Sequence, residues 1–312
     1  MKIRPGLNET IWMAAGAAVL LSFMLLVLHL RENRDPATQL AFKAQRAHLV
    51  GRMQLDLASA SEAEKSAVLA ITDQDSQTFA DQARAASGDV EQERRELGGL
   101  LASGGAQDER ELLAQFSAAF VEFQRIDNDL LALAVKNTNI KAYSLAFGPA
   151  AAALKEMNAA LARFSAAHAD SPDTKTITLL AFGAQVSALH IQTLLPPHIA
   201  EESDQRMDEL EALMATEDTE VRKSLDGLAA LSKFSKDPEL ATATARYTEF
   251  SNIRTQILAL SRENTNVRSL SISLNQKRKV MQVCQATLSA LQQAILAEPI
   301  AGTTYGTPPR PR

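Results

Sequence analysis

Apolar residues recur every three or four positions over most of the chain, which is the spacing of helices that bury one face. One series after residue 139 runs through Ile140, Tyr143, Phe147, Ala150, Leu154, Met157, Leu161 and Phe164. A series near the C-terminus runs through Val267, Leu270, Leu274, Met281, Cys284, Leu288 and Leu291, with Lys277 as the exception. From these series we predict six core residues: Leu154, Met157, Leu161, Met281, Leu288 and Leu291.

The chain contains a duplicated segment. Asn137-Thr138-Asn139, the first tripeptide, returns as Asn264-Thr265-Asn266, the second tripeptide, at a numbering offset of 264 − 137 = 127. The flanks return at the same offset without a gap, and Leu131-Ala132-Leu133 matches Leu258-Ala259-Leu260. Self-similarity at a fixed period indicates two copies of one helical unit.

Both tripeptides interrupt the apolar series, because the phase of the upstream residues does not continue downstream. We interpret each interruption as a turn between two helices, in which Asn and Thr side chains cap a helix start. The alternatives are one continuous helix with a buried polar layer, and a polar pocket formed by the tripeptides.

Other breaks are predicted where short polar residues, glycine or proline gather. Asp73-Gln74-Asp75-Ser76 is matched with Ala200-Glu201-Glu202-Ser203 at the same offset (200 − 73 = 127). Gly104-Gly105 corresponds loosely to Lys236-Asp237-Pro238, and residues 170–173 form the expected linker between the copies. Each copy then holds four helices.

Two proline sites carry further predictions. Pro196-Pro197 is expected to stop a helix in the second copy. Gly148-Pro149 is expected to kink a helix of the first copy, and the second copy has no such pair. The two copies should therefore differ in shape.

The predicted fold is all-α, with an N-terminal transmembrane helix followed by two tandem up-down four-helix bundles. Aromatic residues make up only 5% of the chain and runs typical of strands are missing. The predicted domains are a cytoplasmic N-terminus (1–10), a transmembrane anchor (11–30), bundle copy 1 (36–169), bundle copy 2 (174–298) and a disordered tail (299–312). The copies could pack side by side as a pseudo-symmetric pair or stack end to end.

Residues 11–30 are almost uninterruptedly apolar and long enough to cross a bilayer as a helix. Lys2 and Arg4 precede this run, which weakly favours an N-terminus inside the cell. We interpret the run as an uncleaved anchor rather than a signal peptide, because no small-x-small site follows it. The bundles are then expected in the periplasm, tethered once to a bacterial inner membrane.

Few residues indicate chemistry. The net charge of −5 gives no support to nucleic-acid binding. Cys284 is the single cysteine, permits no intrachain disulfide and is expected in the core. Lys277 could extend to solvent, meet an acidic neighbour or bind an anionic ligand.

His190 and His198 straddle the proline pair, and we interpret them, like His168, as ordinary histidines rather than metal ligands. Residues 201–204 are acidic and fit a helix N-terminus. We find no nucleophile–base pair, phosphate loop or zinc spacing. No catalytic residue, metal ligand or cofactor is predicted, and the ligand-binding residues stay unidentified.

The passage around the first tripeptide resembles the sensor region of methyl-accepting chemotaxis proteins. It contains Phe123, Ile126, Leu131-Ala132-Leu133, a polar turn at 136–139 and Ala142, and the second copy repeats it over 253–274. Residues 194–208 (LLPPHIAEESDQRMD) resemble the first-to-second helix passage of such domains. The likeness covers most of residues 38–298.

This resemblance implies a bundle outside the membrane that binds small molecules or a partner protein. In the family, a piston-like or rotational shift passes through a second membrane helix. This sequence shows no second membrane helix, linker domain or cytoplasmic signalling hairpin, and none of the family's ligand-contacting arginines can be matched to it.

The function we expect is a non-enzymatic sensory or ligand-binding module that acts through a partner. The partner would be a signalling membrane protein, a periplasmic protein or a second copy of the chain. A structural scaffold of the cell envelope that binds no small molecule is the alternative.

Overall fold

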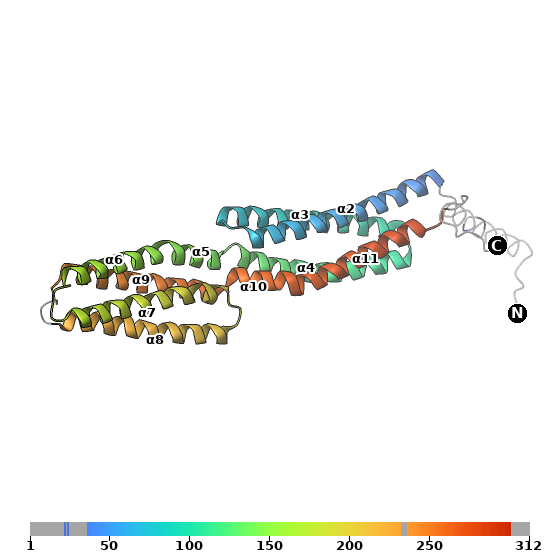
Figure 1. Cartoon of the computed structure of the whole chain (residues 1–312). Helices are drawn as coiled ribbons and strands as arrows, with labels where there is room; N and C mark the ends of the chain where they lie inside the picture. Colours follow the sequence, from blue (N-terminus) through green and yellow to red (C-terminus); the bar gives the residue numbers. More distant parts are fainter. Residues whose placement is uncertain (1–21, 23, 25–35, 232–235, 301–312) are drawn as a thin grey trace, which may run out of the picture. The chain divides into compact units, whose positions relative to one another are not determined.

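The computed structural model describes residues 36–231 and 236–300, together with Ser22 and Met24 (Figure 1). Over this part of the chain every regular element is helical, which confirms the all-α prediction. The predicted N-terminus (1–10), the anchor (11–30) and the tail (299–312) lie outside the described residues, apart from single positions. Among these positions, Ile300 is buried.

The helices follow one another along the chain without strands between them in the described part. They are α2 (Pro36–Leu69), α3 (Asp73–Gly104), α4 (Gln107–Ala134), α5 (Thr138–Leu145), η1 (Ala146–Ala150), α6 (Ala151–Ala167), α7 (Thr174–Ala200), α8 (Asp204–Ala230), α9 (Pro238–Glu263), α10 (Thr265–Ile272), η2 (Ser273–Lys277) and α11 (Arg278–Ala297). η1 and η2 are short π-helical segments. Helices end or begin at both tripeptides. They also end or begin at or next to the other breaks predicted from the sequence, near 73–76, 104–105, 170–173, 200–203 and 236–238.

Contacts divide the chain into two compact units. Unit 1 comprises Met1–Ala58, Ala86–Phe120 and Gln282–Arg312, and unit 2 comprises Ser59–Ala85 and Val121–Met281. Each unit thus takes residues from both copies of the repeat. In the described part of unit 1, the core contains Phe116, Phe120, Cys284, Leu288 and Leu291.

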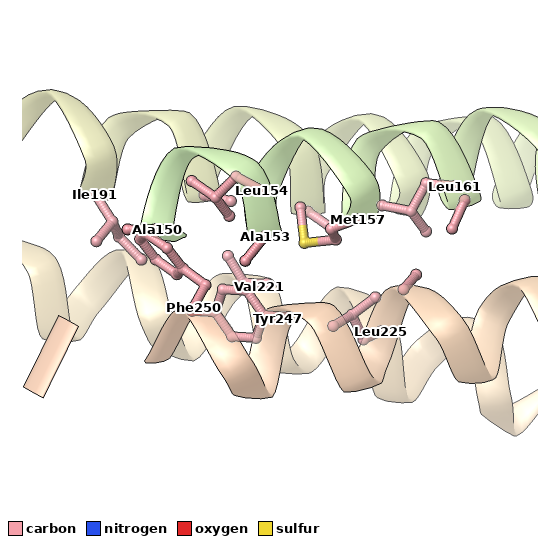
Figure 2. Close-up of a cluster of buried hydrophobic side chains, with 14 of the residues drawn as sticks. Ala150, Ala153, Leu154, Met157, Leu161, Ile191, Val221, Leu225, Tyr247 and Phe250 are labelled. Carbon is pink, nitrogen blue, oxygen red and sulfur yellow. The ribbon is translucent and has the colours of Figure 1, made fainter. Parts of the chain in front are cut away.

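Most of unit 2 is built around one hydrophobic core, which we call the shared core. It combines α5, η1 and α6 from the first copy with α7, α8 and α9 from the second. Figure 2 shows Leu154, Met157 and Leu161 of α6 facing Val221, Leu225 and Tyr247 across its interior. The six helical segments bury their apolar stripes against each other, as their spacing predicts.

The boundary of the shared core does not coincide with the predicted domain boundary at 169–174. Residues 168–173 connect α6 and α7, which pack together rather than belonging to separate domains. One reason lies at the second tripeptide. A single non-helical residue, Asn264, separates α9 from α10, and hairpins between helices need loops of about two to five residues.

The prediction for Pro196-Pro197 was wrong, whereas η1 does interrupt the helix at Pro149 as predicted. α7 contains Pro196 and Pro197 and continues to Ala200. Each proline removes the backbone hydrogen bond to the carbonyl four residues earlier, but the helix ends three residues after Pro197. The carbonyl of Pro196 accepts a hydrogen bond from the Tyr143 hydroxyl at 3.3 Å. The distortion at Pro149 is not unique to the first copy, since the start of η2 follows that of η1 at the repeat offset (273 − 146 = 127).

The π-helical segments correct the predicted register. Phe147 is 66% exposed and Leu274 is 56% exposed, although both were predicted on the buried series. The buried positions are Ala142, Ala146 and Ala150 in the first copy and Ser269, Ser273 and Lys277 in the second. Of these, only Ala150 and Lys277 belonged to the predicted series. A π-turn takes in one extra residue and so shifts the phase of everything before it.

Beyond the shifted turns the predicted core is largely correct. Leu154, Met157 and Leu161 are buried in unit 2, and Leu288 and Leu291 are buried in unit 1. Met281 is only partly buried.

The repeat has a different offset in its first two helices. Ala60 corresponds to Ile191 and Val68 to Ile199 (191 − 60 = 131), and all four are buried. The starts of α3 and α8 differ by the same amount (204 − 73 = 131), so the predicted match was wrong there by one helical turn. The second helix is shorter in the second copy, since α8 has 27 residues and α3 has 32.

Among the described residues, α7 is long and apolar enough to cross a membrane by length and composition. Its buried residues, including Ile177, Ala184 and Ile191, belong to the shared core. Its opposite side exposes Leu179 and Phe182, which raises the overall hydropathy of the helix. The core helix of a soluble protein can meet the same criteria of length and composition as a membrane span. The membrane anchor at residues 11–30 therefore stays a prediction.

Candidate functional site

The two tripeptides begin with a left-handed residue. Asn137 has φ 51° and Asn264 has φ 52°, the only positive φ values of non-glycine residues in the described part of the chain. Asparagine tolerates this conformation better than most residues. Each asparagine ends the preceding helical path and starts α5 or α10, which confirms the predicted helix breaks.

Each tripeptide caps the helix that follows the other one. The backbone N–H of Thr138 donates to Thr265 Oγ1 at 3.2 Å, and the N–H of Thr265 donates to Thr138 Oγ1 at 3.1 Å. Asn139 and Asn266 form the equivalent reciprocal pair at 3.2 and 3.1 Å. The predicted capping therefore occurs between the copies, whereas neither Asn137 nor Asn264 caps its own helix with its side chain.

The remaining amide groups complete a buried polar layer. Asn139 Nδ2 donates to Asn264 Oδ1 at 2.7 Å, and Asn266 Nδ2 donates to Asn137 Oδ1 at 3.0 Å. Asn137, Thr138, Asn139, Asn264 and Thr265 are all buried. From the sequence, a break between helices and a buried polar layer were alternatives. In the structure both occur at the tripeptides.

A cavity of about 320 Å³ lies beside this layer. Its lining is mainly apolar and includes Ile140, Ile199 and Val267. Asn139 and Asn266 also line it, but their amides are already paired with the opposite tripeptide. The tripeptides are therefore better explained as the junction of the two copies than as a polar binding pocket.

A second polar group, the Lys277 cluster, comprises Lys277, Asp127 and Glu64. Lys277 Nζ donates to Asp127 Oδ1, lies 3.8 Å from Glu64 Oε2 and sits 4.1 Å from the centre of the Phe123 ring. All three charged side chains are at most 3% exposed. Of the three environments considered for Lys277 from the sequence, the structure shows contact with acidic neighbours.

Glu64 is the unusual member of the cluster. Among the described residues, neither oxygen of its carboxylate accepts a hydrogen bond of ordinary geometry. Burial raises the pKa of Glu64, and the nearby Lys277 ammonium and Ser273 side chain oppose this rise. Glu64 lines a cavity of about 280 Å³ together with Ser61, Ser273, Leu274 and Met281. The cavity adjoins η2, and π-helical turns are frequent at functional sites.

The repeat supplies an internal comparison for this cluster. Glu64 corresponds to Leu195 (195 − 64 = 131) and Lys277 to Ala150 (277 − 150 = 127), and both counterparts are buried apolar residues of the shared core. Asp127 corresponds to Arg254, which pairs instead with Asp218 at 3.1 Å. The same helical framework therefore packs without the buried lysine and glutamate.

His198 brings together a nucleophile–base arrangement that the sequence did not reveal. Its Nδ1 lies 2.8 Å from Ser261 Oγ and its Nε2 lies 2.9 Å from Glu211 Oε1. This order resembles a hydrolase triad, but Ser261 is fully buried and its hydroxyl donates to the carbonyl of His198 at 3.0 Å. The group holds the end of α7 against α8 and α9, and burial lowers the pKa of His198.

The other histidines considered above have separate environments. His190 is exposed and lies 3.2 Å from Glu217, whereas His168 lies 2.9 Å from Asp237. Over the described ranges, no group of three potential metal-binding side chains occurs. Ser203 accepts a hydrogen bond from the N–H of Arg206 and so caps α8, whose first residue is Asp204, as expected of a helix N-terminus here.

Sequence patterns missed Glu64, Asp127 and Ser273. Glu64 does follow Leu57 and Ala60 at the three-to-four spacing of a buried stripe, which was the available signal. Asp127 gave the same signal, since it lies four residues after Phe123 and three before Leu130. Ser273 gave none, because its burial depends on the π-turn.

No family model matches this chain, and neither a curated protein nor a solved structure matches it significantly.

Proposed function

We propose that this protein is a membrane-anchored, non-enzymatic sensory module of helical bundles, similar to the sensor region of chemotaxis receptors. It would reside on the periplasmic side of a bacterial inner membrane. Ligand binding would alter helix packing, and a partner membrane protein or a second copy of the chain would read this change.

The observation that carries the proposal is the Glu64 cavity. A buried carboxylate without a hydrogen-bond partner costs stability, and replacing buried charges by apolar residues is often neutral or stabilising. The second copy of the same framework has Leu195 at the corresponding position. The Glu64 carboxylate lowers stability and is not required for the helices to pack, so a role in binding explains it better than a role in folding.

The Lys277 cluster is also placed where binding can act on packing. Lys277 lies at the end of η2 and contacts Glu64 of α2 and Asp127 of α4. A ligand that changed the charge balance at Glu64 would alter contacts among three helices, which is a means of shifting two packed states.

The test is a thermal-melting screen of the full chain in detergent against a library of small metabolites. A ligand at about 100 times its Kd adds about 2.7 kcal/mol of stability, enough to raise the melting temperature measurably. We expect at least one compound to raise it in the parent and not in Glu64→Leu. No stabilising compound in the library would count against the proposal and favour the scaffold, for which the fully paired tripeptides are the supporting observation.

A further inference from the structure

The charges of the Lys277 cluster do not balance. Lys277 carries one positive charge, while Asp127 and Glu64 together carry two negative charges when ionised. Lys277 makes its hydrogen bond with Asp127 and a cation–π contact with Phe123. Glu64, 3.8 Å from Lys277, is left as the acidic group whose charge is not matched by a hydrogen-bonded cation.

The surroundings of Glu64 supply the acceptors that an ammonium group requires. An ammonium has three N–H donors and no acceptor. The cavity presents the Glu64 carboxylate and the hydroxyls of Ser61 and Ser273, and all three residues are buried. In the other copy, Ser273 corresponds to Ala146 (273 − 146 = 127), so this acceptor is missing there together with the glutamate.

We propose that the cavity beside η2 binds a small ligand through one protonated amino group, held by Glu64, Ser61 and Ser273. This inference names the ligand class for the sensory site and rests on the function proposed above. The ligand's ammonium supplies the hydrogen-bonded cation that Glu64 lacks and brings the cluster to electrical neutrality. Charge-assisted hydrogen bonds of this kind are the stronger ones in proteins.

The rest of the cavity restricts the ligand to a single cationic group. Lys65 and Arg278 also line it, and both are exposed at the surface. Their charges repel a second ammonium at the far end of the ligand. Leu274 and Met281 provide apolar surface for a short aliphatic part, and the volume of about 280 Å³ limits its length.

Isothermal titration calorimetry on the full chain in detergent tests this with four probes that share a four-carbon chain. The probes are n-butylammonium, 1,4-diaminobutane, butyrate and 1-butanol. We expect n-butylammonium to bind at one site, and the other three to bind at least about tenfold more weakly. Glu64→Gln keeps the shape of the side chain but removes its charge, and should weaken n-butylammonium binding about tenfold or more.

Glu62→Gln is the matched control, because Glu62 is an exposed residue of the same helix, and its binding should equal that of the parent. Glu64→Leu introduces the residue of the second copy and serves as a second variant if Glu64→Gln does not fold. Preferential binding of butyrate, amine binding unaffected by either Glu64 variant, or no binding of any probe would each overturn the inference. Glu64-dependent stabilisation by a library compound without an amino group would overturn it while leaving the sensory function intact.

Discussion

Thr138 and Thr265 are far apart in the chain, but their hydroxyl oxygens lie 3.2 Å apart in the structure. Each hydroxyl accepts a hydrogen bond from the other residue's backbone N–H. Two helix starts are thereby capped by the same reciprocal contact. The repeated residues are thus the place where the two copies recognise each other.

Removing one of these hydroxyls should destabilise unit 2. Thr265→Ala leaves the buried N–H of Thr138 without its acceptor, and we expect a loss of about 1–2 kcal/mol in the free energy of unfolding. Thr138→Ala should behave alike because the contact is reciprocal. Denaturant unfolding of both single variants and the double variant should show non-additivity of about 0.5–1 kcal/mol. Thr248→Ala, at an exposed position of α9, is the control, and losses no larger than its own would contradict the cross-capping.

The members of the Lys277 cluster should respond to substitution in opposite ways. Glu64→Leu removes a buried carboxylate without a hydrogen-bond partner and should leave the protein as stable or more stable, by about 1–3 kcal/mol at neutral pH.

Lys277→Met leaves two buried carboxylates and should cost about 3 kcal/mol or more. Because these carboxylates must then bind protons in the folded state, the deficit should shrink as the pH falls from neutral towards about 5. Chemical denaturation at several pH values measures both effects. A stable Lys277→Met variant with no pH dependence would show that the ion pairs do not form.

Glu93 should make stability depend on pH. Burial, and then the neighbouring Asp56, raise the pKa of Glu93 from 4.5 to about 7. Between these values the folded protein holds a proton that the unfolded chain has released, so stability decreases as the pH rises from about 4.5 to about 7.

Glu93→Gln should remove this dependence and raise stability above about pH 7 by on the order of 2 kcal/mol. Glu96→Gln, an exposed neighbour on α3, should leave the profile unchanged. An unaltered slope in Glu93→Gln would assign the pH dependence to another group.

The shifted register separates two apolar residues of the same predicted series. Leu161 is fully buried in the shared core, and Leu161→Ala should cost about 2–5 kcal/mol. Phe147 is 66% exposed, and Phe147→Ala should change stability by about 0.5 kcal/mol or less despite removing a larger side chain. Equal losses from the two variants would restore the unshifted register.

The sequence by itself determined the helices, the repeat and the turns at the tripeptides, because these depend on local spacing and on residues that favour caps or left-handed geometry. It also placed Leu154, Met157 and Leu161 correctly, since they follow the π-turn and keep the helical period. Tertiary structure decided which helices share a core, because one residue at Asn264 interrupts a helix without reversing it. It also decided the site, since Glu64, Asp127 and Lys277 come from three distant segments whose meeting no local pattern encodes. The π-turns decided that Phe147 is exposed and Ser273 buried. An extra residue in a turn changes which side chain faces inward, and no local sequence pattern shows this.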